Sequence, residues 1–294
     1  MEKIIGDNKE IMQRVKWQFQ RGKVRNFLQT HIFILPSVLG VLLFYLVPLV
    51  FIVLSSFQRG GSFSFESYQI VWKNVAFWLA TKNTLLFMLI AIPLLMTLSL
   101  AFARFLSKSI GAFDRLKIVY ILPLALPAVS MSLFWRFFFA PRGLLNGFLH
   151  VKIDWLDTAL SFLVVIFLFI WKNFGYMMIL WLAGIMSVSQ SMIEAARIDG
   201  ASERTIFLRI ILPTIQPTAV VVYLLSLIQS FRVFRDIYAL AGDYPHEQMY
   251  LWQHLFNNWF RDFELDKMTA GTCVYLLILL IALFPIAKGM RREK

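Results

Sequence analysis

The sequence predicts an all-α, polytopic membrane protein with six transmembrane helices and both termini in the cytoplasm. Of its 294 residues, 59% are hydrophobic and 16% are charged, and the mean hydropathy is +0.68. A soluble domain is only about half apolar and about a quarter charged. The apolar residues are gathered in long runs between short charged stretches, and the basic residues favour alternate connections between the runs. Both patterns are typical of a chain that crosses a bilayer repeatedly.

The chain is expected to form one domain, because no polar linker or soluble-sized segment interrupts the runs. Residues 1–30 mix basic with apolar side chains, which indicates either an amphipathic helix on the cytoplasmic leaflet or a solvated tail. Residues 31–290 form the predicted transmembrane domain, which includes a cytoplasmic loop at 187–212. Residues 291–294 form a cytoplasmic tail.

A helix needs about 20 mainly apolar residues to cross the hydrocarbon core of a bilayer. Six runs approach or exceed this length, and only the fourth contains a charged residue, Lys172. The predicted spans are residues 32–57, 84–103, 118–135, 159–186, 210–231 and 268–287. Several prolines lie within the runs, and the bends that they introduce suggest a bundle shaped around a cavity.

The orientation of the spans follows from lysine and arginine, which are enriched in cytoplasmic connections. Of the 29 basic residues, 18 lie in the two termini, the second–third connection and the fourth–fifth connection. The three opposite connections hold seven, and the remaining four lie in or beside spans. Both termini are therefore placed in the cytoplasm.

Several functional classes are disfavoured. The net charge of +12 lies at the ends of apolar runs and not in one basic patch, so nucleic acid is not an expected partner. The single cysteine, Cys273, allows neither an intrachain disulfide nor a cysteine-based metal site. His246 and His254 lack zincin spacing and are interpreted as surface residues of an outer loop. The sequence contains no phosphate-binding loop for ATP, and we predict neither catalytic residues nor a metal site.

The connection between the fourth and fifth spans carries the most specific motif. Ser191, followed three residues later by Glu194, predicts a capping box that begins a short helix. Gly200 is placed to end that helix, and Pro213 lies where a proline in the first turn of the fifth span costs little. A short cytoplasmic helix with exposed small residues can fit into a groove of another protein.

This loop resembles the cytoplasmic signature of binding-protein-dependent ABC importer permeases: Glu-Ala-Ala, three residues, Gly, nine residues, then Ile-x-Leu-Pro. The matching residues, with an aspartate that is also typical, are Glu194, Ala195, Ala196, Asp199, Gly200, Ile210, Leu212 and Pro213. In that family the segment forms a coupling helix that docks into a cleft of the ATP-hydrolysing subunit. The resemblance implies the same role here, with Gly200 allowing close approach.

The resemblance covers about residues 33–287 and is to the sugar-importing, maltose-type branch. The stretches that carry it include Leu122-Pro123, Trp171-Lys172, Ala183-Gly184 and residues 231–238. The branch often continues with Thr-Gly-Gly-Pro, whereas this chain has Ala-Gly-Asp-Tyr-Pro at 241–245. The outer loop that follows the fifth span therefore departs from the pattern of the branch.

The resemblance implies a permease subunit of an ATP-driven sugar or oligosaccharide importer in the bacterial inner membrane, supplying half of the translocation pathway. The implied partners are a second homologous permease, two ATP-binding cassette subunits, a periplasmic or extracellular solute-binding protein, the sugar and membrane lipids. The chain itself is then not an enzyme and needs no cofactor, because the partner ATPase binds ATP and magnesium.

Polar residues inside spans are costly to bury and are candidates for function. The candidates for the substrate pathway are Asn173, Tyr176, Gln229, Arg232 and Asp236. The first two share a face midway along the fourth span, and the other three recur at intervals of three and four residues near the outer end of the fifth. Their hydrogen-bonding groups suit sugar hydroxyls, and the apolar faces of sugar rings suit the nearby aromatic residues Trp171, Tyr176, Trp181 and Phe231.

Other interpretations of these polar residues stay open. Lys172 is interpreted as structural, through snorkelling or a pair with a carboxylate of a partner subunit. Arg232 and Asp236 are four residues apart, so they could simply pair with each other. An acidic substrate would raise the importance of Arg232 and Arg235.

The expected mechanism is alternating access, in which ATP-driven movement of the coupling helix turns the cavity from outside to inside. An importer of another solute, such as an amino acid, a peptide or phosphate, is the alternative within the family. An ion-driven secondary transporter is disfavoured, because acidic residues are absent from the predicted span interiors. A membrane-embedded enzyme is disfavoured by the lack of a catalytic constellation.

Overall fold

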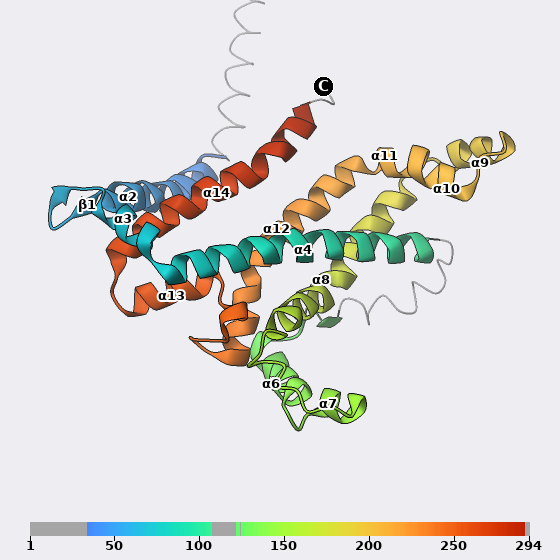
Figure 1. The fold of residues 1–294 in the computed structure, drawn as a ribbon. Helices are drawn as coiled ribbons and strands as arrows, with labels where there is room; N and C mark the ends of the chain where they lie inside the picture. The colour runs from blue at the N-terminus through green and yellow to red at the C-terminus, as the bar shows by residue number, and fades with distance from the viewer. Residues whose placement is uncertain (1–33, 108–121, 124, 292–294) are drawn as a thin grey trace, which may run out of the picture.

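Helices dominate the structure, a computed structural model that describes residues 34–107, 122–123 and 125–291 (Figure 1). In this part of the chain the only sheet is an antiparallel hairpin of β1 (Gln58–Arg59) and β2 (Ser62–Phe63). The all-α class is confirmed. The predicted segment 1–30, the beginning of the third predicted span and residues 292–294 lie outside the described residues.

The described residues form helices of very different lengths. In chain order they are η1 (Leu42–Leu46), α2 (Val47–Ser56), α3 (Glu66–Lys73), α4 (Val75–Leu106), α6 (Ala128–Phe139), α7 (Leu144–Leu149), α8 (Ser161–Met186), α9 (Gln190–Ile198), α10 (Glu203–Ile206), η2 (Phe207–Ile211), α11 (Leu212–Thr214), α12 (Gln216–Ala241), η3 (Glu247–Met249), α13 (Trp252–Arg261) and α14 (Leu265–Arg291).

Four of the helical segments are long and apolar enough to cross a membrane by length and composition: Ile34–Ser56, α4, α8 and α12. They correspond to the first, second, fourth and fifth predicted spans. Helix α14 covers the sixth predicted span, residues 268–287, and has 27 residues. The total of six spans and the cytoplasmic placement of both termini stay predictions.

The third predicted span, residues 118–135, is not one continuous helix in its described part. The helix is broken at Leu126 and Pro127, and α6 begins at Ala128 and continues to Phe139. Pro127 lacks a backbone N–H and pushes the preceding residue away from helical geometry, which accounts for the break. The broken segment forms part of a cavity wall described below.

The fifth span also differs from its prediction of residues 210–231. The helix breaks at Ile215, and α12 runs from Gln216 to Ala241, about ten residues beyond the apolar run. The charged residues after Phe231 were expected to end the span, but they lie along a cavity and continue the helix. Asp236 therefore lies inside this membrane-length helix, beyond the apolar run in which no acidic residue was expected.

The main core is formed by α4, α8 and α12, which cross and contact one another (Figure 1). Phe87 of α4 and Phe169 of α8 meet edge to face, with ring centroids 5.2 Å apart, and both are buried. Helices α8 and α12 approach each other closely at Gly184, where an added Cβ would lie 2.6 Å from Oγ1 of Thr218. This glycine therefore sets the spacing of the two helices that carry the candidate pathway residues.

A second core joins α3, α13 and α14 to the beginning of α4. Buried Trp252 of α13 donates from Nε1 to Oγ1 of Thr81 at 2.8 Å, and its backbone N–H donates to Oγ1 of Thr84 at 3.1 Å. Asn83 Nδ2 donates to the backbone carbonyls of Glu247 and Tyr250. These hydrogen bonds thus hold the segment between α12 and α14 against α4.

His254 of α13 is fully buried, so its interpretation as a surface residue is wrong. His246 is half-buried, and its Nδ1 accepts a hydrogen bond from the backbone N–H of Gln248. The His254 ring meets Phe234 edge to face, and its Nδ1 accepts from the backbone N–H of Leu251 at 3.3 Å. Burial lowers the pKa of His254 to about 4, against a smaller opposing effect of the Asp243 carboxylate.

The buried imidazole predicts an acid-sensitive fold. The folded-state pKa lies below the ordinary value of 6.5, so the unfolded chain binds more protons between pH 6.5 and 4, and stability falls as the pH falls through that window. The difference amounts to about 3 kcal/mol between pH 7 and pH 4. We expect the thermal unfolding midpoint to drop by several degrees from pH 7.5 to pH 4.5, and the variant His254→Gln to lose most of that drop.

Exposed His150 provides the control, since the variant His150→Gln should retain the full pH dependence. An equal drop in His254→Gln and in the unmodified protein would show that the buried imidazole does not cause the acid sensitivity.

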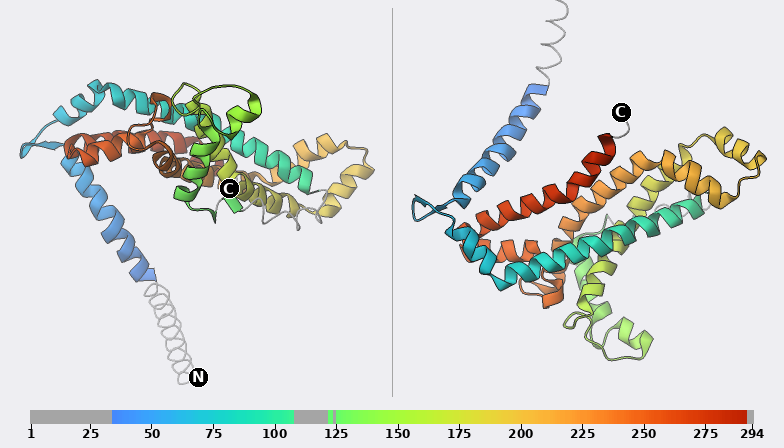
Figure 2. Two further views of the ribbon diagram at one scale, coloured as in Figure 1. Left: turned by 90° about the horizontal axis from the view of Figure 1, so that it is seen from below. Right: turned by 45° about the horizontal axis from the view of Figure 1, so that its top comes forward.

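The helical segment Ile34–Ser56 projects away from the remaining helices (Figure 2). Its C-terminal part, α2, contacts α14, but most of its apolar side chains are exposed, including Phe44 at 77% and Phe51 at 64%. Such a surface is stable only against lipid or another apolar protein surface.

Candidate functional site

A polar cavity lies between α8 and α12, with Leu126 and Pro127 from the broken segment in its wall. Its volume is about 370 Å³, within the range of small-ligand sites. Its remaining lining consists of Phe169, Lys172 and Asn173 of α8 and Gln229, Arg232, Val233, Arg235 and Asp236 of α12. Two helices that are distant in sequence thus bring all four of their charged residues to one place.

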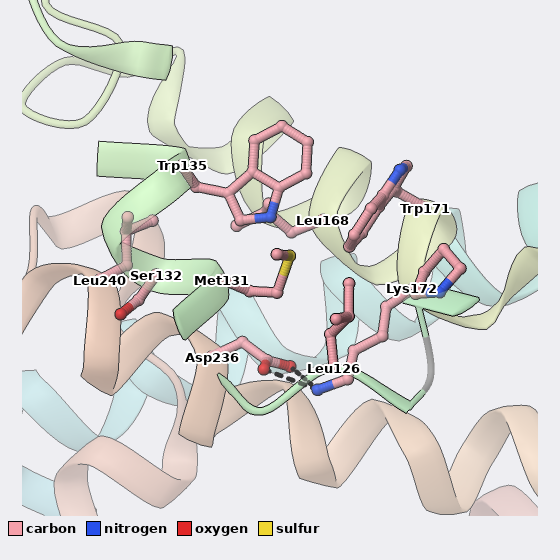
Figure 3. A pocket seen from close by; sticks show the side chains of 10 residues that line it. Leu126, Met131, Ser132, Trp135, Leu168, Trp171, Lys172, Asp236 and Leu240 are labelled. Carbon is pink, nitrogen blue, oxygen red and sulfur yellow. Dashed lines mark hydrogen bonds and ion pairs between the residues drawn. The ribbon is translucent and has the colours of Figure 1, made fainter. Parts of the chain in front are cut away.

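Lys172 and Asp236 form an ion pair across this cavity (Figure 3). The Lys172 ammonium group donates to both carboxylate oxygens of Asp236, at 2.7 and 2.9 Å. Their side chains are only 23% and 18% exposed. Asp236 therefore pairs with Lys172 of α8 and not with Arg232. Lys172 in turn needs no carboxylate from a partner subunit to neutralise it.

Four of the five predicted pathway residues line the cavity: Asn173, Gln229, Arg232 and Asp236. The fifth, Tyr176, does not line it and packs against the main core instead. Asn173 is buried, and its Nδ2 donates to the backbone carbonyl of Phe169 at 2.8 Å. Its Oδ1 has no hydrogen-bond partner in the described part of the chain.

Aromatic residues lie beside the ion pair. A small apolar pocket joins Lys172 and Asp236 to Met131, Trp135 and Trp171 (Figure 3). The two indole rings are nearly perpendicular, with centroids 5.0 Å apart. Hydrogen-bonding groups beside flat apolar rings are the combination that a sugar requires. The sequence predicted Trp171 for this role but not Trp135, which reaches the site from α6.

The predicted coupling loop folds as a short helix at one extremity of the molecule (Figures 1 and 2). Helix α9 leaves Glu194, Ala195 and Gly200 exposed, and only Ile193 is buried. Three further matched residues, Ala196, Ile210 and Leu212, pack partly buried against the main core, whereas Asp199 and Pro213 are exposed.

The end of α9 is a Schellman motif. The backbone N–H of Ala201 donates to the carbonyl of Ala196, and that of Gly200 to the carbonyl of Arg197, both at 3.0 Å. Gly200 has φ +82°, a value that residues with a side chain rarely adopt. The prediction that Gly200 ends the helix is therefore confirmed. An added Cβ at Gly200 would have no atom of the described residues within 4 Å, so the described fold itself makes no close approach there.

The predicted capping box is wrong. Helix α9 begins at Gln190, so Ser189 and not Ser191 holds the N-cap position, and no side chain caps the helix there. The hydroxyl of Ser191 instead lies 2.7 Å from that of Ser189. The Glu194 side chain is consequently not used to begin the helix and stays exposed.

The side chain of Arg104, at the end of α4, contacts this loop, a contact that the sequence did not predict. Arg104 Nη2 donates to the backbone carbonyl of Glu203 at 3.2 Å, and the guanidinium lies 4.0 Å from the ring centroid of Phe207. Arg197 of α9 pairs with the Glu203 carboxylate at 2.9 Å. Through Glu203 at the start of α10, these contacts connect α9 to the end of α4, and Arg104 also contacts the first residue of η2.

The helical bundle, its polar cavity and its projecting short helix define a multi-pass membrane protein built to carry a solute. The family model described as "Binding-protein-dependent transport system inner membrane component" matches residues 98–287. The chain belongs to this family of transport-system membrane components.

Several relatives are similar over most of the chain. The trehalose/maltose transport system permease protein of Thermococcus litoralis is 30% identical over 236 residues, which are 76% of this chain and 80% of the relative. The lactose transport system permease protein of Rhizobium radiobacter is 26% identical over 267 residues, 85% of this chain and 89% of the relative. The arabinooligosaccharides transport system permease protein of Bacillus subtilis is 30% identical, covering 71% of each chain.

The fold is similar to that of a chain in the crystal structure of a bacterial ABC transporter involved in the import of the acidic polysaccharide alginate. The TM-score is 0.78 at 20% identity, covering 92% of this chain and 97% of that chain. This similarity supports the helical architecture described above.

Proposed function

We propose that the chain is the permease subunit of an ATP-driven importer of sugars or oligosaccharides and supplies half of the translocation pathway. The relatives whose names specify trehalose and maltose, lactose, or arabino-oligosaccharides support the substrate class. The cavity adds support from the chain itself, because it combines amide and charged groups with indole rings.

The observation that carries this proposal is the projecting helix α9, which exposes Glu194 and Ala195, the first residues of the family signature. Its exposed apolar side chains, Met192 and Ile198, have no cover in the described part of the chain, and Ile198 is 87% exposed. We assign α9 to the cleft of an ATP-binding cassette subunit, which binds ATP and magnesium. The site residues for this coupling are Glu194, Ala195, Ala196, Asp199, Gly200, Ile210, Leu212 and Pro213.

The proposed complex contains a second, homologous permease and two ATPase subunits. The exposed apolar segment Ile34–Ser56 supports a membrane partner, because α14 contacts only its C-terminal part. A solute-binding protein delivers the sugar to the predicted outer connections, chiefly residues 58–83 and 236–267. The pathway in this subunit is assigned to Asn173, Gln229, Arg232 and Asp236, whereas Tyr176 acts through packing.

Reconstitution of the purified complex into vesicles tests the proposal. With its solute-binding protein outside and ATP inside, the complex should take up at least one of the probes maltose, lactose and arabinotriose, or an acidic counterpart such as trigalacturonate. Uptake should stop when either ATP or the binding protein is omitted. Saccharide transport by this chain alone, without a nucleotide-hydrolysing partner, would contradict the proposal.

A further inference from the structure

We propose that the cavity between α8 and α12 takes an acidic saccharide, a sugar that carries carboxylate groups. This inference rests on the proposed function and narrows its substrate class. The observations that carry it are the charges of the cavity wall and one unpartnered hydrogen-bond acceptor beside them.

The cavity has an excess of positive charge. Four ionisable side chains line it: Lys172, Arg232, Arg235 and Asp236. The Lys172–Asp236 pair neutralises itself through two short hydrogen bonds. The two arginines have no carboxylate partner among the described residues. Arginine stays protonated in proteins, so two positive charges face the cavity without a counterion among the residues that the structure describes.

Such an excess is costly in a membrane-embedded chain unless a ligand or solvent compensates it. Arg232 and Arg235 are three residues apart, which places their Cα atoms about 4.5 Å apart along the helix axis. Each guanidinium presents a planar fork of N–H groups that matches the two oxygens of a carboxylate. A sugar chain with carboxylates on its rings supplies the missing negative charge.

Asn173 distinguishes an acidic sugar from a simple anion. Its Nδ2 is committed to the Phe169 carbonyl, which fixes the amide so that Oδ1 is an acceptor with no donor in the described structure. Asn173 is 3% exposed and lies in the cavity wall. A carboxylate ion has only acceptor oxygens to offer, whereas a sugar hydroxyl donates. One ligand that carries both hydroxyls and carboxylates therefore satisfies Asn173 and the arginines together.

The test measures equilibrium binding to the purified membrane complex without the solute-binding protein, so that the selectivity of that protein does not enter. The probes are trigalacturonate and its methyl ester, which has the same rings and hydroxyls without the charges. The complex should bind the acid at least about tenfold more tightly, as expected for charge-assisted hydrogen bonds. The preference should shrink as the salt concentration rises.

Two variants and one control locate the effect. The double variant Arg232→Gln/Arg235→Gln should bind both probes with nearly equal affinity, and Arg232→Lys/Arg235→Lys should retain part of the preference. Exposed Arg136 of α6 does not line the cavity, so Arg136→Gln should retain all of it.

Equal binding of the acid and the ester by the unmodified complex would overturn the acidic substrate class, while ATP-driven uptake of a neutral sugar would leave the proposed function intact. A second result would also overturn the acidic substrate class: the glutamine variant fails to assemble and the unmodified complex shows no preference for the acid. The two arginines would then be assigned to pairing between subunits. If neither saccharide binds and no ATP-driven uptake occurs, the proposed function fails as well.

Discussion

Replacement of Gly200 with glutamate is expected to abolish import while leaving the chain inserted in the membrane. Gly200 has φ +82° at the end of α9, and a side chain there is strained by about 1–2 kcal/mol. The larger effect comes from the assigned interface, because a charged side chain would enter a surface that has to meet the ATPase subunit closely. The measurements are co-purification of the ATPase subunit and ATP-dependent uptake, both of which should fall at least about tenfold.

Gly61, in the turn between β1 and β2, provides a matched control. It also has φ +82°, and an added Cβ would likewise have nothing within 4 Å. The variant Gly61→Glu therefore imposes a similar strain in a different part of the molecule and should keep the ATPase subunit bound. If Gly200→Glu retains the ATPase subunit and transports at the normal rate, α9 is not the coupling helix.

The features that the sequence predicted well are those set by local pattern. Long apolar runs located the membrane-length helices, since an uncharged stretch of that length has few other stable environments. The spacing from Glu194 to Pro213 predicted a short helix that ends at Gly200, because a glycine in this position supports a specific helix ending. Gly200 and its hydrogen bonds confirm this prediction.

The features that the sequence did not predict depend on contacts between distant elements. Asp236 looked like the end of a span, or a partner for Arg232, because the residue that neutralises it lies 64 positions earlier, in α8. The burial of His254 follows from packing against Phe234, which no spacing rule contains. Arg104 likewise reaches Phe207 and Glu203, the latter 99 positions later in the sequence.

Removal of either member of the Lys172–Asp236 pair should destabilise the bundle and impair import. Lys172→Met leaves a carboxylate unpaired between α8 and α12, and Asp236→Leu leaves an ammonium. The cost is roughly 2–4 kcal/mol, somewhat below that of a fully buried pair, because both side chains keep partial exposure. The thermal unfolding midpoint of the purified complex should fall by several degrees in each single variant.

The double variant Lys172→Met/Asp236→Leu separates stability from transport, because it removes both charges together. It should recover much of the lost stability, since two apolar side chains leave no unpaired charge. Import should nevertheless remain low, because the cavity has lost the carboxylate and the ammonium group of its polar wall. Lys267 in the first turn of α14 is the matched control, because it pairs with Glu264 just before that helix. Lys267→Met should cost at most about 1 kcal/mol, as expected of a local, partly exposed pair. If the losses of stability of the two single variants instead add in the double variant, the two charges do not stabilise each other. The Lys172–Asp236 pair would then not be what holds α8 and α12 together.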